Sequence, residues 1–140
     1  MKRKIALILF ILIGIFLLTS CGNTVSTSEA KKYTTDFLEA IVANEYEKAE
    51  ELLHPDAKED EDVIEDFVKQ LTDNNIILSG DVTDLKTTSI NVAAYTSEHK
   101  GSSCKIGGTV KVGGVTYNFI CLVVNNKAGK GIFAFNIEKD

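Results

Sequence analysis

The chain has 140 residues, with 15 basic and 20 acidic side chains and a formal net charge of −5 at pH 7. This length suits one domain with a modest hydrophobic core. The acidic balance argues against a protein that binds nucleic acid or anionic lipid head groups through a basic surface.

The first twenty residues have the pattern of an export signal. Three basic residues follow Met1, and an apolar run then extends from Ile5 to Leu18. The run is shorter than the roughly 20 apolar residues that span a bilayer. A positive cap, a short apolar run and small residues at its exit are typical of a secretory signal. An uncleaved membrane anchor is the alternative.

The exit of this run, Leu18-Thr19-Ser20-Cys21, resembles the bacterial lipobox. The resemblance implies cleavage after Ser20, a diacylglyceryl thioether on Cys21 and further acylation, typically by palmitate. Such acyl chains contribute about 0.8 kcal/mol per buried CH₂ and hold a protein on a membrane. We therefore expect a lipoprotein anchored to the bacterial cell membrane through Cys21, with its domain on the extracytoplasmic side. Loss of Lys2, Arg3 and Lys4 leaves twelve bases against twenty acids, a net charge of −8.

Helices are predicted after a short tether of residues 21–27, so the domain is expected over residues 28–140. Ser26 and Glu29 have the spacing of a capping box. Asn44 and the pair His54-Pro55 are typical helix ends, which predicts a first helix up to Asn44 and a second from Tyr46 to Leu53. The first helix is supported by apolar residues at helical spacing: Tyr33, Phe37, Leu38, Ile41 and Val42.

A third helix and several strands follow. The apolar stripe of residues 60–72 predicts the helix, and alternation at Ile90, Val92 and Ala94 predicts the first clear strand. Further strands are expected over residues 104–112, 115–124 and 132–138. Turn residues separate them at 98–102, 113–114 and 125–131. Helices followed by an antiparallel meander predict an α+β fold, with the helices packed on one face of a curved sheet.

The motif A-x-x-Y-x-x-x-F-L-x-A-I-x-x-N-E-Y-E-K-A-x-x-L-L, from Ala30 to Leu53, resembles the nuclear-transport-factor-two-like superfamily. In particular, the chain resembles small lipid-anchored bacterial domains of unknown function with that fold. The resemblance implies a cone-shaped sheet wrapped around the first helix. Members include ketosteroid isomerases, polyketide cyclases and non-catalytic domains of cell-wall proteins, so the fold does not specify the function.

We expect a non-catalytic binding or scaffolding domain in the cell envelope. Its partner would be an envelope protein, a cell-wall component or a small apolar ligand. The alternatives are an enzyme of the isomerase or cyclase kind and an inhibitory or protective protein. A deep pocket with an inward carboxylate would favour the enzyme, whereas a filled interior with an exposed apolar patch would favour partner binding.

In this interpretation no residue is assigned to catalysis. The sheet positions expected to face inward are mostly apolar, namely Val110, Val112, Val115, Tyr117 and Phe119. Tyr33 and Asp36 of the first helix are the candidates for lining a pocket, as carboxylates and tyrosines do in the isomerase-like relatives. The alternative is that Tyr33 is a core aromatic residue and Asp36 is exposed.

No cofactor or metal ion is expected. Residues 45–66 contain eleven acids, but Lys58, the missing glycine and Phe67 break the pattern of an EF-hand loop. A solvated acidic face explains the run, with a weak divalent-ion site as the alternative. His54, at a helix end where a cation favours the dipole, and His99 have no second ligand at usable spacing.

Two cysteines fall in the predicted strands. A two-residue turn at Gly113-Gly114 pairs Val112 with Val115 and, farther back, Ile106 with Cys121. Cys104 and Cys121 then lie diagonally on one face, about 7–8 Å apart, at the upper limit for a disulfide. An exported protein favours oxidation. The sequence is therefore compatible with a disulfide between Cys104 and Cys121 and also with two buried free thiols.

Overall fold

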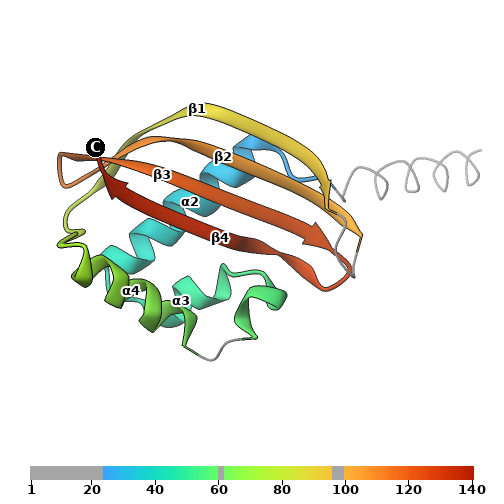
Figure 1. Ribbon diagram of the computed structural model, residues 1–140, viewed down its shortest axis with the longest axis horizontal. Coiled ribbons are helices and arrows are strands. Elements are labelled where there is room, and N and C mark those ends of the chain that lie inside the picture. The colour runs from blue at the N-terminus through green and yellow to red at the C-terminus, as the bar shows by residue number, and fades with distance from the viewer. Residues whose placement is uncertain (1–23, 60–61, 96–99) are drawn as a thin grey trace, which may run out of the picture.

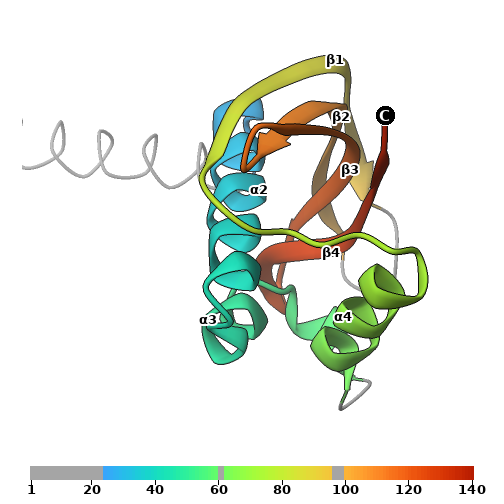
Figure 2. The ribbon, with the colours of Figure 1, turned by 90° about the vertical axis from the view of Figure 1, so that its left-hand side faces the viewer.

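The computed structural model describes residues 24–59, 62–95 and 100–140. Within them it contains three α-helices followed by a four-stranded antiparallel sheet in the order β1-β2-β3-β4, which confirms the predicted α+β class. Figures 1 and 2 show that the sheet curves over α2, while α3 and α4 lie on the side of β4. The elements are α2 (Thr27–Val42), α3 (Tyr46–Glu51), α4 (Val63–Asp73), β1 (Val82–Tyr95), β2 (Gly101–Val112), β3 (Val115–Asn126) and β4 (Gly129–Lys139).

Helix α2 begins at the predicted capping box. The Ser26 side chain accepts a hydrogen bond from the Glu29 N–H, and the Glu29 carboxylate accepts one from the Ser26 N–H. Val25 is already buried, so the fold begins inside the segment expected to be a tether. At its other end the helix finishes at Val42, and Asn44, two residues later, has a φ of 58°, the left-handed conformation expected after a helix end.

The buried face of α2 differs slightly from the predicted stripe. Its buried residues are Ala30, Thr34, Phe37, Leu38, Ala40 and Ile41, whereas Tyr33 and Val42 are only partly buried against the core. The Thr34 hydroxyl donates to the Ala30 carbonyl at 2.9 Å, which allows this polar side chain to lie inside. Each large apolar side chain buried here stabilises the fold by about 1.5–3 kcal/mol.

The predicted hairpin register of β2 and β3 is confirmed. Val112 pairs with Val115 and Ile106 with Cys121 across the turn at Gly113 and Gly114, where both glycines have positive φ values of 57° and 81°. The register puts all five positions expected to face inward on one face of the sheet, but Val115 is 51% exposed at the start of its strand. The other four are buried.

Strand β4 contains a bulge that the sequence did not predict. Val123 pairs with Ile132 and Leu122 with Ala134, so Phe133 is an extra residue in the ladder. The bulge places Ile132 and Phe135 on the same inner face although they are three positions apart. The turn expected at residues 125–131 is also shorter, because β3 continues to Asn126 and β4 begins at Gly129.

The outer edge of β4 is covered by the segment after α3. Leu53 forms a parallel bridge with Ile132. The His54 N–H donates to the Ile132 carbonyl at 2.8 Å, and the Ile132 N–H donates to the Leu52 carbonyl at 2.9 Å. Pro55 then starts a short 3₁₀ helix, η2 (Pro55–Lys58). This segment fixes α3 to the sheet.

Candidate functional site

Helix α4 leaves a cleft on each of its sides. The larger one lies between α4 and β4 and has a volume of about 420 Å³, within the range of small-molecule sites. Leu53, Val63 and Ile64 line both clefts. The larger cleft is also lined by Phe37, Asp56, Ala57, Asp66, Phe67, Gln70, Ile132, Phe133, Ala134 and Phe135. Ten of these thirteen lining residues are apolar or aromatic, and Asp56, Asp66 and Gln70 add polar groups to the wall.

Three phenylalanines form the base of this larger cleft. Phe37 of α2 lies with its ring centroid 5.4 Å from that of Phe67 on α4 and 4.9 Å from that of Phe135 on β4. Phe67 and Phe135 meet edge to face at 5.7 Å. Such tilted ring pairs contribute about 0.5–1.5 kcal/mol beyond their buried area. The triangle attaches α4 to α2 and to the sheet beside the cleft.

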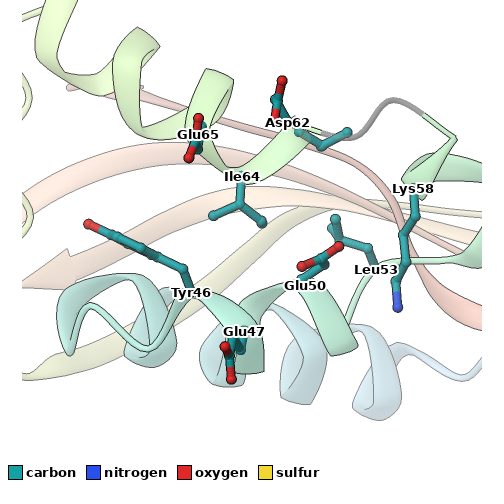
Figure 3. A pocket seen from close by; sticks show the side chains of 9 residues that line it. Tyr46, Glu47, Glu50, Leu53, Lys58, Asp62, Ile64 and Glu65 are labelled. Atoms are coloured by element: carbon teal, nitrogen blue, oxygen red, sulfur yellow. The ribbon is translucent and has the colours of Figure 1, made fainter.

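The smaller cleft lies between α3 and α4 and has a volume of about 180 Å³. Figure 3 shows Ile64 pointing from α4 toward α3, while Glu47 points away from the cleft. The Tyr46 side chain, 40% exposed, donates from its hydroxyl to the Asn44 side chain at 3.0 Å. The floor is apolar and carboxylates of both helices, such as Glu50 and Glu65, surround it.

These carboxylates do not form a metal site in the described part of the chain. Among residues 24–59, 62–95 and 100–140, no three histidine, cysteine, aspartate or glutamate side chains are grouped so that they could hold a metal ion. Asp60 and Glu61 of the acidic run lie outside the described residues. The arrangement is an apolar cleft with a negative rim.

Tyr33 and Asp36, the candidates for a pocket, line neither cleft beside α4. Tyr33 packs partly buried against the core. Asp36 accepts a hydrogen bond from Lys32 at 2.6 Å on the surface of α2. The space between α2 and the sheet, where the pocket was expected, is filled by buried side chains including Leu38, Ile106 and Tyr117.

Cys104 and Cys121 are buried as free thiols on the inner face. Burial raises the pKa of Cys121 to about 12, against a partial opposing effect of its hydrogen bond with Thr34. Burial also raises the pKa of Cys104, whose thiol bonds to the Thr27 side chain. Both groups are therefore held as neutral thiols, which are poor nucleophiles.

His54 does not act as a cation at a helix end. It is fully buried, its Nδ1 accepts from the Asp56 N–H at 3.1 Å, and its Nε2 lies 2.9 Å from the side-chain oxygen of Asn126. These bonds assign a neutral ring with its proton on Nε2. The ring caps η2 and links it to β3.

Two other predicted positions, Cys21 and His99, lie outside the described residues. None of the helices described between Thr24 and Asp140 is long and apolar enough to span a bilayer.

The aromatic wall of the larger cleft was not predicted as a site. Phe67 was expected only as a core residue of the third helix, and Phe133 and Phe135 only as parts of a strand. The repeated aromatic residues in Phe133-Ala134-Phe135 were the available signal, but the bulge and the position of α4 were needed to bring them to Phe67.

Comparisons with protein-family models, with curated proteins and with solved structures give no match for this chain. The geometry of the clefts and the sequence pattern of the N-terminus therefore carry the functional argument.

Proposed function

We propose that the chain is a bacterial lipoprotein whose domain, a small cone of the nuclear-transport-factor-two-like type, binds an apolar ligand or partner segment without catalysis. The observation that carries the binding function is the cleft between α4 and β4, which is lined mainly by apolar and aromatic side chains. The filled space under the sheet supports binding at this cleft over an isomerase-like reaction in the interior.

The position of the fold in the sequence supports a short membrane tether. Val25 is buried, so only residues 22–24 separate Cys21 from the packed domain. Even fully extended, the chain from Cys21 to Val25 covers about 14 Å. A lipid on Cys21 would hold the domain close to the membrane surface, where apolar ligands and the segments of other envelope proteins are abundant.

Mass spectrometry of the protein purified from membranes tests the anchor. We expect loss of residues 1–20 and a diacylglyceryl thioether on Cys21. The Cys21→Ser variant should appear without acyl chains. A mature wild-type protein that keeps Met1, or carries an unmodified thiol at Cys21, would remove the anchor from the proposal.

A neutral apolar fluorophore, N-phenyl-1-naphthylamine, tests the cleft. We expect the acylated chain in nanodiscs to bind it saturably above the background of empty nanodiscs. Ala57→Phe should weaken this binding at least several-fold by filling the cleft, because Ala57 is one of its lining residues. Ala43→Phe, at an exposed position after α2, is the matched control. Equal binding by both variants would show that the fluorophore does not bind in this cleft.

A further inference from the structure

The two edges of the sheet differ. Leu52 to His54 cover the edge of β4 through backbone hydrogen bonds. Strand β1 pairs only with β2, and no other described segment pairs with its outer edge. Figure 1 shows β1 as the outermost strand, on the side away from α3 and α4. A long uncovered edge is a template for another strand.

The regular part of this edge is its second half. Register shifts interrupt β1 between Thr83 and Lys86 and between Thr87 and Ser89, whereas the pairing from Ser89 to Tyr95 is continuous. This stretch, SINVAAY, carries no charged side chain. It therefore lacks the lysine, proline and bulge by which exposed edges are usually protected.

The register identifies the backbone groups that point outward. Val112 and Val115 close the hairpin as a hydrogen-bonded pair, and such pairs alternate along an antiparallel ladder. By this alternation, Ile106 and Cys104 of β2 form backbone hydrogen bonds with β3. The residues between and beside them, Lys105 and Ser103, therefore form their backbone hydrogen bonds with β1.

Asn91 pairs with Lys105 and Ala93 with Ser103, so these two residues of β1 direct their N–H and C=O groups toward β2. The hydrogen bond from the Ser103 hydroxyl to the Ala93 carbonyl, 3.4 Å long, agrees with this direction. The N–H and C=O groups of Ile90, Val92 and Ala94 consequently point to the open edge.

The same residues expose apolar side chains. Ile90 and Val92 pair with Ile106 and Cys104, which are fully buried on the inner face. Ile90 and Val92 share that face but are 54% and 57% exposed. Backbone groups and apolar side chains at this edge are thus both available to a neighbouring strand.

We propose that a second copy of this chain pairs with this edge, with Val92 of one copy opposite Val92 of the other in antiparallel orientation. Ile90 of each copy then lies opposite Ala94 of the other, and the exposed apolar row becomes continuous across the dimer. Because the stretch is uncharged, self-pairing brings no like charges into the ladder.

The position of the N-terminus favours a second copy as the occupant, a step that rests on the proposed lipid anchor. Thr27, at the start of α2, bonds to the thiol of Cys104, which pairs with Val92. The tether therefore leaves the domain near the two-fold axis. Figure 2 shows that α2 lies on one face of the sheet. Because the two-fold axis of the proposed pair runs perpendicular to the sheet, α2 of both copies would lie on the same side. Both lipids can then enter one membrane, which raises the effective concentration of the two edges.

Disulfide trapping in native membranes tests the pairing with the full chain. Opposed residues of a hydrogen-bonded antiparallel pair have Cα atoms about 5.5 Å apart, which suits a disulfide. Because Cys104 lies directly opposite Val92 on β2, both cysteine variants also carry Cys104→Ala, which prevents an internal disulfide with position 92. In this background we expect Val92→Cys to give several-fold more disulfide-linked dimer on mild oxidation than Ile77→Cys. Ile77, at 81% exposed, is the more accessible position and reports random collision.

A second substitution tests the surface itself. In the Val92→Cys background, Ile90→Lys should abolish the dimer, since it places ammonium groups beside the axis. Ile120→Lys, on β3 at 45% exposure, should leave it unchanged; circular dichroism checks that both variants fold.

Val92→Cys yields no greater than those of Ile77→Cys, or cross-links mainly to a different protein, would overturn the pairing. If the mature Val92→Cys protein is found outside the membrane fraction and still forms the disulfide-linked dimer, the result would support the pairing and refute the anchor.

Discussion

At the scale of single residues, Glu29 joins the start of α2 to β4. Its carboxylate accepts from the Ser26 N–H and forms an ion pair with Lys130. The hydrogen bond from Lys130, followed by that from Ser26, lowers the pKa of Glu29 below its ordinary value of 4.5. Because the folded pKa is the lower one, this stabilisation is present above pH 4.5 and is lost as the pH falls through the folded pKa.

We therefore expect Glu29→Gln to lower the free energy of unfolding at pH 7 by about 0.5 kcal/mol, a small value because the pair is solvent-exposed. The difference from wild type should disappear as the pH falls below 4. Urea unfolding followed by circular dichroism at several pH values measures both effects. Glu39→Gln, an exposed carboxylate farther along α2, is the control. A difference that persists at pH 3 would contradict the assignment to charge.

Cys121 makes the free energy of unfolding depend on pH in the alkaline range. Its pKa is raised to about 12 by burial, whereas the unfolded thiol ionises near 9. Below pH 9 the thiol is neutral in both the folded and the unfolded chain. As the pH rises from 9 toward 12 the unfolded thiol ionises first, so the free energy of unfolding falls. Compared with Cys121→Ala, the wild-type free energy of unfolding should fall by about 1.4 kcal/mol more per pH unit above 9. Denaturant unfolding between pH 7 and 10.5 measures this slope; parallel curves for the two proteins would contradict it.

At the scale of elements, the attachment of α3 to the sheet requires a glycine at position 131. A Cβ atom there would lie 2.6 Å from the backbone nitrogen of His54 and 2.6 Å from the backbone carbon of Leu53. Gly131→Ala must therefore push this segment away from β4, breaking the backbone bonds between Ile132 and residues 52 and 54.

We expect Gly131→Ala to lower the free energy of unfolding by about 2–4 kcal/mol, because a buried polar segment loses its partners. Hydrogen exchange should accelerate at the amides of His54 and Ile132 before it does so in β2. Lys127→Ala, at an exposed position in the same hairpin, should change neither quantity. Unaltered exchange at His54 would show that the segment tolerates the added methyl group.

Elements set by local chemistry could be predicted from the sequence. The Ser26–Glu29 capping box, the end of α2 at Asn44 and the Gly113-Gly114 register depend on neighbouring residues, and the structure contains all three. The exposed pair Ile90 and Val92 was not predicted, because alternation does not reveal how far α2 extends across the sheet. The cleft beside α4 was missed because it depends on long-range pairing. The bulge at Phe133 is visible only from the register of β4 against β3.

At the scale of the whole molecule, net charge and apolar surface have opposite effects on self-association. The full chain has a net charge of −5, and removal of the proposed signal makes it −8. Two copies therefore repel each other. The proposed contact at Ser89–Tyr95 contains no charges, so no attractive ion pair opposes this repulsion.

Salt should consequently strengthen the dimer. The Debye length falls from about 10 Å at 0.1 M to about 3 Å at 1 M ionic strength, which screens the repulsion and leaves the backbone and apolar contacts intact. We expect the yield of the Val92→Cys disulfide to rise as NaCl increases over this range, while the collision yield of Ile77→Cys changes less. A partner held by the acidic rim between α3 and α4 would show the reverse dependence, because screening weakens attraction between opposite charges. A Val92→Cys yield that falls with salt would therefore place the association at a charged surface and not at β1.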